Sequence, residues 1–207
     1  MSAQTVGGLF EDINHKLTLV SDKEKSSDLE GSPYYHVEFV KGIVNFENQK
    51  PIEVYLRYNV AEERIEIKTQ LESSETYQLP GDSKTNYIIN SEKYVLESIS
   101  NSGKEIYGYF IELFNGENLR LVKKPAARFI EGEKARTGYE QNTPSRITIE
   151  EEYFIISEGN VINVRPQSKD VKKAFNSPEA QQFLKKNKIK TEADLKGFVS
   201  YLDKEKG

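Results

Sequence analysis

A strict alternation of apolar and polar residues between positions 51 and 69 constrains this chain more than any other feature. In PIEVYLRYNVAEERIEIKT, apolar residues recur at every second position from Ile52 to Val60. This two-residue period is typical of a strand with one buried and one exposed face. Three residues, Ala61–Glu63, interrupt the pattern before a second alternating run, Arg64–Thr69. Because so short a connection only lets neighbouring strands fold back, the stretch predicts an antiparallel hairpin.

Further β-prone runs follow the same pattern. A strand is predicted from Tyr34 to Val40, a hairpin joins residues 107–114 to Leu119–Val122 across Asn115-Gly116, and another spans Arg146–Val164. Helix start signals come only after Pro166, at Ser168, at Ser177-Pro178 and at Thr191–Asp194. We therefore predict a mainly β (α+β) fold, in which an antiparallel meander forms a curved sheet, sandwich or partial barrel, with two or three short C-terminal helices.

Changes in composition suggest three segments. Residues 1–33 form an N-terminal segment, in which 6–20 is either an amphipathic helix or ends in a strand, followed by a mobile polar loop. Residues 34–166 form the β domain, and residues 167–207 a helical cap packed on it. Within the β domain, residues 123–145 are rich in charge, Gly and Pro, and are either a long excursion or a disordered loop.

Charge and composition exclude several classes of function. The net charge of −4 disfavours nucleic acid as a partner, since phosphate backbones select basic surfaces. The chain has no Cys, which excludes disulfides, thiol catalysis and Cys-ligated metals. No run of about 18 apolar residues is present, so we expect no membrane-spanning helix.

The first residues bear on localisation. Met1-Ser2 is followed by Ala3-Gln4, a pair typical of the position where a signal peptide has been removed. The alternative is a native cytosolic start at Met1. We expect a secreted protein of the periplasm, cell surface or extracellular space.

Motifs for catalysis are missing from the sequence. Neither a G-x-S-x-G elbow nor a glycine-rich phosphate loop occurs. The two histidines, His15 and His36, would need a carboxylate brought to them by the fold to hold a metal. Acidic runs at 11–12, 62–63 and 150–152 would need pairing across a cleft to act as a glycosidase. We therefore predict no cofactor and no metal, assign no catalytic residue, and favour a non-catalytic role.

Two groups of residues are candidates for a binding surface. Tyr55 and Arg57 lie on the polar face of the first predicted hairpin, and His36 on the polar face of the strand before it. The basic run Lys185, Lys186 and Lys188 belongs to a C-terminal segment, residues 168–207, that carries ten lysines against six acids. That segment has a net charge of +4 and leaves −8 for residues 1–167, so it favours an anionic membrane surface or an acidic partner. The alternatives are tyrosines that fill the core and an ordinary solvated helix face.

Several short motifs resemble a known group of proteins. They are K-G-I-V-N-F at 41–46, L-R-Y-N at 56–59, Y-F-I-I at 153–156, and a closing K-K-A-F, F-L-K-K-N-K-I-K and D-L-K-G-F-V-S-Y-L segment. With them the chain resembles uncharacterised exported β-rich proteins of Bacteroidetes-type bacteria. The resemblance implies export, and it implies no activity or site residue.

Three functions are compatible with these features. The favoured one is an exported, non-catalytic binding or envelope-associated protein, whose partner is a protein, a glycan or an envelope component. The others are a carboxylate-dependent hydrolase and a carrier of an apolar ligand in a β cavity. Facing carboxylates in a cleft, or His36 beside acids, would favour the hydrolase. An enclosed apolar cavity would favour the carrier.

Overall fold

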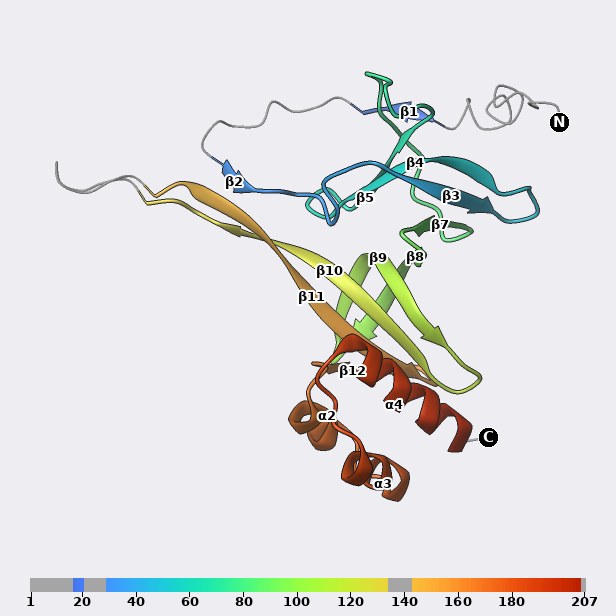
Figure 1. The fold of residues 1–207 in the computed structure, drawn as a ribbon, viewed down its shortest axis with the longest axis vertical. Coiled ribbons are helices and arrows are strands. Elements are labelled where there is room, and N and C mark those ends of the chain that lie inside the picture. Colours follow the sequence, from blue (N-terminus) through green and yellow to red (C-terminus); the bar gives the residue numbers. More distant parts are fainter. Residues whose placement is uncertain (1–16, 21–28, 134–142, 206–207) are drawn as a thin grey trace. The chain divides into compact units, whose positions relative to one another are not determined.

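The computed structural model describes residues 17–20, 29–133 and 143–205, and it contains two compact units (Figure 1). Unit 1 comprises residues 1–91 and 126–150, and unit 2 comprises residues 92–125 and 151–207. Strands account for 49% of the structure and helices for 17%. The predicted mainly β class is therefore confirmed. The boundaries of these units are set by contacts between residues, whereas the segment boundaries predicted after residues 33 and 166 mark changes in composition.

Unit 1 is built around the hairpin predicted from residues 51–69. Its strands lie in the antiparallel order β1-β6-β5-β4-β3-β7. A further short strand, β2, pairs in parallel with the beginning of β11 (Ser145–Ser157). The bounds are β1 Thr18–Leu19, β2 Leu29–Gly31, β3 Val40–Phe46, β4 Ile52–Asn59, β5 Arg64–Lys68, β6 Tyr77–Gln78 and β7 Thr85–Ile89.

The alternation in β4 acts as predicted. Ile52, Val54, Leu56 and Tyr58 are all at most 3% exposed, and the residues between them are exposed or partly buried up to Arg57. β4 pairs with β5 from Tyr55↔Lys68 to Asn59↔Arg64, which is the predicted hairpin. The predicted strand Tyr34–Val40 is wrong, because residues 35–39 are irregular and β3 begins at Val40. Only Tyr34 makes an isolated bridge, to Asn59.

Unit 2 is an antiparallel meander closed by helices. Its strand order is β8-β9-β10-β11-β12, and β12 comes within 8 Å of β8. Two-residue turns at Ser102-Gly103 and Glu158-Gly159 have positive φ at both positions, as tight hairpins require. The remaining bounds are β8 Glu92–Asn101, β9 Lys104–Asn115, β10 Arg120–Ile130 and β12 Asn160–Val164.

The segment 123–145 differs from its prediction. The return strand expected at Leu119–Val122 begins at Arg120 and continues as β10 to Ile130, and β11 begins at Ser145. Residues 134–142 lie outside the described part of the chain, as do 1–16 and 21–28. The expectations of an N-terminal helix, a mobile loop and a trimmed signal peptide fall mainly there, and His15 does as well. In the described remainder, Thr18–Leu19 is a strand, one of the two alternatives for that segment.

Three helices end the chain, as predicted: α2 Ser168–Ala174, α3 Pro178–Lys186 and α4 Glu192–Glu205. The Ser177 side chain caps α3 by accepting from the Ala180 N–H, with Pro178 at the first helical position. Thr191 and Asp194 cap α4 by accepting from each other's N–H group. Ser168 does not cap α2. Gln167 occupies that position, and the Ser168 hydroxyl bonds to the backbone of Ile189.

Apolar side chains cover both faces of the unit 2 strands. On one face, Phe110 and Phe154 pack edge to face with ring centroids 6.2 Å apart, beside Ile99 and Val122. On the other face, Leu121, Tyr153 and Ile155 pack against the helices. Consecutive side chains along β10, and likewise along β11, thus point to opposite faces of the sheet, as the two-residue period of a strand requires. No helix among the described residues has the length and apolarity needed to cross a membrane.

Candidate functional site

The candidate site lies in unit 2, where the three helices meet the loop between β9 and β10. Phe198 of α4 is at the centre of the helical layer, fully buried between Phe175 and Phe183 at centroid distances of 5.5 and 5.4 Å. Both contacts are edge to face, an arrangement that aromatic pairs prefer. The rings come from the residue that ends α2, from α3 and from α4, and they join the three helices.

Asp203 of α4 fixes the loop that contributes to the site. Its carboxylate accepts from three backbone N–H groups, those of Glu117, Asn118 and Leu119, at 3.1, 2.8 and 2.7 Å. Asp203 is 9% exposed, and hydrogen bonds to a charged acceptor are stronger than neutral ones. A Cβ added at Gly116 would overlap this carboxylate. The loop sequence and the helix are therefore matched to each other, and Leu119 is held against the helices.

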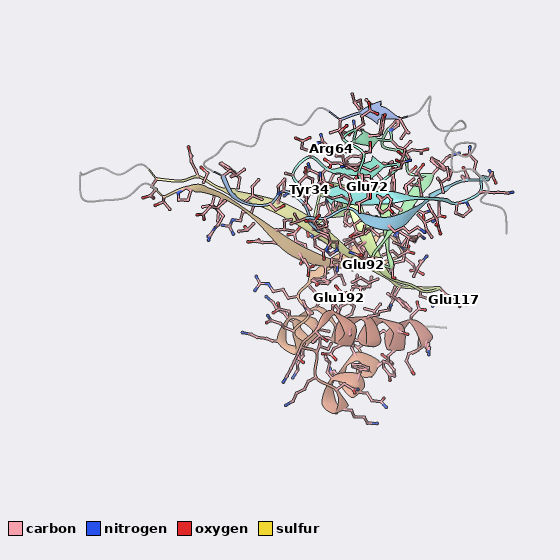
Figure 2. The ribbon with its side chains drawn as sticks, turned by 45° about the horizontal axis from the view of Figure 1, so that its top comes forward. Tyr34, Arg64, Glu72, Glu92, Glu117 and Glu192 are labelled. Carbon is pink, nitrogen blue, oxygen red and sulfur yellow. The ribbon has the colours of Figure 1, made fainter. Side chains whose placement is uncertain are left out.

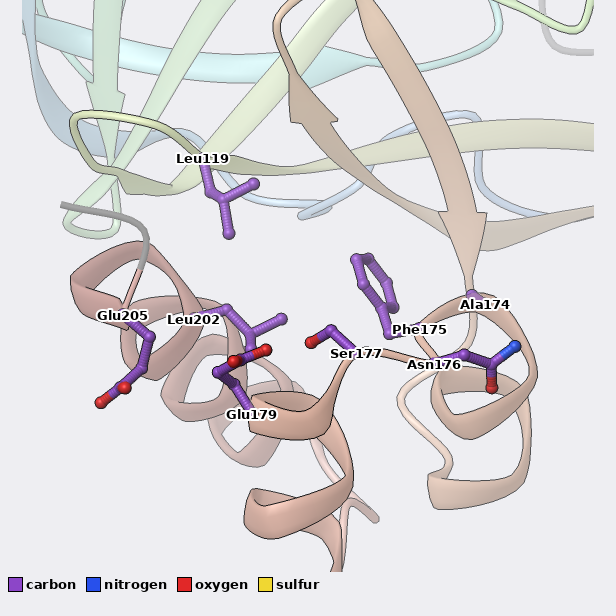
Figure 3. A pocket seen from close by; sticks show the side chains of 8 residues that line it. All are labelled: Leu119, Ala174, Phe175, Asn176, Ser177, Glu179, Leu202 and Glu205. Atoms are coloured by element: carbon purple, nitrogen blue, oxygen red, sulfur yellow. The ribbon is translucent and has the colours of Figure 1, made fainter.

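An apolar pocket of about 280 Å³ opens between these elements (Figure 3). Its floor consists of apolar side chains from the loop, the end of α2 and the end of α4, namely Leu119, Ala174, Phe175 and Leu202. Its rim consists of polar side chains from the α2–α3 connection, the start of α3 and the end of α4, namely Asn176, Ser177, Glu179 and Glu205. We call this site the apolar pocket.

The rim of the apolar pocket is acidic. The backbone N–H of Glu179 itself and the Ser177 hydroxyl lower the pKa of the Glu179 carboxyl, so this group is ionised at neutral pH. The pKa of the nearby Tyr201 hydroxyl is raised by partial burial and by the charges of Glu205 and Glu179. No described cation forms an ion pair with either carboxylate. The pocket thus combines an apolar floor with two carboxylates at its rim, which suits a ligand with an apolar body and a positive charge.

A second, polar pocket of about 480 Å³ shares Ala174 with the first. Arg165, Asp170 and Lys173 contribute its charges, and Asn163 and Val164 complete it. Its two cations and one acid give it the opposite sign to the apolar pocket.

Unit 2 also contains a charged cluster that the sequence did not indicate. Lys123 is 4% exposed, and its Nζ lies 2.9, 3.0 and 3.8 Å from carboxylates of Glu92, Glu192 and Glu151. Figure 2 labels two of these, Glu92 on β8 and Glu192 at the start of α4. The Tyr153 hydroxyl donates to Glu151 and lies 3.2 Å from Glu192, and its pKa is raised above the ordinary value by burial and by Glu151.

One of the residues predicted as a surface in unit 1, Arg57, belongs to a second charged cluster. The Arg57 guanidinium lies 3.6 Å from the Tyr34 ring centroid and 4.2 Å from that of Phe39, and pairs with Glu66 at 2.7 Å. Glu66 is fully buried and also accepts from Arg64 at 2.9 Å. These contacts with Tyr34, Phe39 and Glu66 give Arg57 a structural role within unit 1.

The other predicted surface residues lie as follows. Tyr55 is partly buried on β4, and His36 is partly buried in the irregular segment before β3. The His36 Nε2 atom is buried and makes no hydrogen bond with any described residue. Lys185, Lys186 and Lys188 are exposed, and none forms an ion pair within the described part of the chain. They belong to unit 2, whereas Tyr55, Arg57 and His36 belong to unit 1.

Four of the five described residues in the acidic runs considered for catalysis, all except Glu152, have cationic or hydroxyl partners. Glu62 pairs with Arg64, Glu63 accepts from the Tyr58 hydroxyl, and Glu150 pairs with Arg128. No group of three or more metal-ligating side chains is assembled among residues 17–20, 29–133 and 143–205. Charge pairing is thus the described role of these carboxylates.

Sequence reasoning missed the apolar pocket, because its walls come from three separated segments, namely Leu119, residues 174–179 and residues 202–205. One signal was present: Phe175 and Leu202 lie at the ends of predicted helices, next to Asn176-Ser177 and Glu205. Comparison of the chain with protein-family models, with curated proteins and with solved structures finds no match.

Proposed function

We propose that this protein is a non-catalytic binding module that recognises a segment of a protein partner through the apolar pocket. A large apolar side chain of the partner occupies the floor, and a positively charged group beside it lies at Glu179 and Glu205. The observation that carries the proposal is an apolar floor beneath two carboxylates that have no described cationic partner. Unpaired charge around an apolar depression favours a ligand of complementary charge.

The size of the apolar pocket supports a side chain as its occupant. Ligand pockets for whole small molecules commonly enclose about 300–1,000 Å³. At about 280 Å³ and open to solvent at its rim, this pocket suits one aromatic or branched side chain better than a lipid. Burying such a side chain contributes about 1.5–3 kcal/mol. Contacts outside the pocket must therefore supply most of the affinity for a partner.

The two other functions have less support. The interior of the unit 2 sheet is filled by Phe110, Phe154, Ile99 and Val122, which leaves the β-cavity carrier without a described chamber there. The hydrolase requires free carboxylates facing one another across a cleft. Glu62, Glu150 and Glu63 of the acidic runs instead pair with Arg64, Arg128 and the Tyr58 hydroxyl, respectively.

Three small probes of the same shape test the proposal on the whole chain. Phenethylamine is cationic, N-acetyl-phenylalaninamide is neutral and N-acetyl-phenylalanine is anionic. Each is titrated into protein carrying ¹³C-labelled leucine methyl groups, and the shifts of Leu119 and Leu202 are followed by NMR. We expect saturable shifts with dissociation constants of about 1 mM or weaker. The affinities should decrease from cation to neutral probe to anion.

Variants localise the binding. Asn176→Trp places a large ring at the exposed rim and should abolish the shifts. Gln182→Trp, an equally exposed change on α3 outside the pocket lining, should leave them intact. Glu179→Gln with Glu205→Gln should remove the preference for the cation. Shifts at Leu119 and Leu202 no larger than those caused by N-acetyl-alaninamide would overturn the proposal.

A further inference from the structure

The polar pocket adjoins the apolar pocket and differs from it in charge. Ala174, the last residue of α2, lines both. The carboxylates of Glu179 and Glu205 line the apolar pocket, and the cations Arg165 and Lys173 line the polar pocket. A chain segment that lies over Ala174 and reaches both pockets would therefore meet carboxylates in one and cations in the other.

Arg165 is available for an additional ligand. Its side chain is 78% exposed, and its Nε atom lies 4.0 Å from the nearest Asp170 carboxylate oxygen, which is too far for a hydrogen bond. The guanidinium donates no hydrogen bond to any described residue. Arginine presents five N–H donors in a planar fork that matches a carboxylate. Asp170 thus lies near the guanidinium without accepting a hydrogen bond from it.

Lys173 adds a second cation at the same pocket. It is exposed in the last turn of α2 and forms no ion pair within the described residues. A lysine in the last helical turn stabilises the helix dipole, which accounts for its presence but leaves its three N–H donors free. Beside it, the amide of Asn163 offers a neutral donor. Together these groups favour a single carboxylate despite Asp170.

We propose that the polar pocket binds a carboxylate of the same partner segment whose apolar side chain occupies the apolar pocket. This inference rests on the proposed function and narrows it to one class of partner. The recognised segment carries a basic group, a large apolar residue and a carboxylate. They follow one another in this order, read either from the N-terminus or from the C-terminus of the segment. The two pockets then fix both the position and the direction of the bound segment.

The test uses a phage-displayed library of random twelve-residue peptides, selected on the immobilised full chain. We expect selected peptides to share a basic residue, a large apolar residue and an acidic residue in this order or its reverse, with the apolar and acidic residues at a constant separation. Arg165→Gln/Lys173→Gln protein should still select the apolar residue but lose the acidic one. The matched control Lys185→Gln/Lys186→Gln removes the same charge from α3 outside both pockets, and it should select the same peptides as the wild type.

Affinities of synthetic peptides then identify the source of the carboxylate. Neutralising Arg165 and Lys173 should weaken a selected peptide about three- to tenfold, the range for an exposed charge-assisted contact. Replacing the acidic residue of the peptide by glutamine should weaken its binding to the wild-type protein by the same factor. The same replacement should cause no further loss of binding to the Arg165→Gln/Lys173→Gln protein. If a free C-terminal carboxylate replaces the acidic side chain without loss, the pocket takes either source.

The outcomes separate the two proposals. An apolar residue selected without a constant acidic neighbour, or an acidic preference that survives Arg165→Gln/Lys173→Gln, overturns the carboxylate site and leaves the apolar pocket standing. Selection of no apolar residue, or a pattern unchanged in Asn176→Trp protein, overturns the proposed function and this inference with it. Circular dichroism of each variant establishes that it is folded as the wild type.

Discussion

The two units of this protein each bury a charge, and they do so with opposite polarity. In unit 1 a fully buried acid, Glu66, is held by two arginines, Arg57 and Arg64. In unit 2 a buried base, Lys123, is held by three carboxylates. The first cluster comes from a single hairpin, within ten residues of sequence. The second gathers side chains from β8, β10, β11 and α4.

This difference shows how the two kinds of charged cluster depend on the fold. Arg57 and Glu66 are opposite each other in the β4–β5 register, so forming the hairpin is enough to bring them together. Lys123 meets Glu192 only when α4 has docked on the strands. Breaking the first cluster should therefore destabilise the β4–β5 hairpin. Breaking the second should weaken the packing of α4 on the strands.

The largest effect is expected for Glu66→Ala. This change leaves two poorly exposed guanidinium groups facing each other without their anion, which destabilises by about 3–5 kcal/mol. Hydrogen exchange measured by mass spectrometry should rise in β4 and β5 and stay unchanged in α4. Glu66→Gln keeps two hydrogen-bonding atoms in place and should lose less. A decrease of less than about 1 kcal/mol in the free energy of unfolding for Glu66→Ala would mean that water hydrates the two guanidinium groups in place of the carboxylate.

Lys123→Met should have a smaller effect in a different place. The substitution fills similar volume but leaves three carboxylates without their cation. Because these side chains are 26–37% exposed, they relax toward solvent, and the expected loss is roughly 1–3 kcal/mol. Exchange should rise at the start of α4, where Glu192 lies, and not in β4. Equal protection of α4 in both proteins would contradict a helix-docking role.

Gly116→Ala tests a second long-range contact of α4. An added methyl group overlaps the Asp203 carboxylate, and such overpacking costs about 1–3 kcal/mol. Gly197→Ala is the matched control, since the same substitution on α4 meets no atom within 4 Å. It should stabilise by about 0.5–1 kcal/mol, because alanine is the better helix former. Urea denaturation followed by circular dichroism measures both, and two changes of the same sign would argue against the contact.

The smallest effect is expected for an exposed ion pair on the same sheet as Glu66. Lys41 and Glu53 are 2.7 Å apart, with side chains 67% and 65% exposed. Water screens such a pair and competes for both partners. Lys41→Ala should leave the melting temperature unchanged within error, in low and in high salt. A clear decrease would show that exposure is a poor guide to which charges matter here.

Sequence reasoning succeeded where structure is set by near neighbours. The alternation from Ile52 to Val60, the turn at Glu158-Gly159 and the caps of α3 and α4 each depend on a few consecutive residues. The segment Tyr34–Val40 has the same alternation and is not a strand. Arg57 accounts for this failure, because it donates to the Val37 carbonyl and stacks on Tyr34 and Phe39. A long-range contact thus overrides local pattern.

The candidate site was not predictable for the same reason. Leu119 and Leu202 are 83 positions apart, and only the loop held by Asp203 brings them to one pocket. Lys185, Lys186 and Lys188 are exposed but line neither pocket, so their charge did not point to the site. Tyr55, Arg57 and His36 were considered for their chemistry, and Arg57 instead anchors an irregular segment to its neighbouring strand.

The Asp203 contact has a consequence for how the polypeptide matures during synthesis. The three loop residues whose N–H groups bind the Asp203 carboxylate are synthesised 84 to 86 residues before Asp203. Until that carboxylate is synthesised, these three N–H groups lack the acceptor that they have in the folded protein. At about 5–20 residues per second, this interval lasts roughly 4–17 s. We therefore expect the tip of this hairpin to become fixed only after α4 is synthesised, later than the β4–β5 hairpin, whose paired charges lie within ten residues.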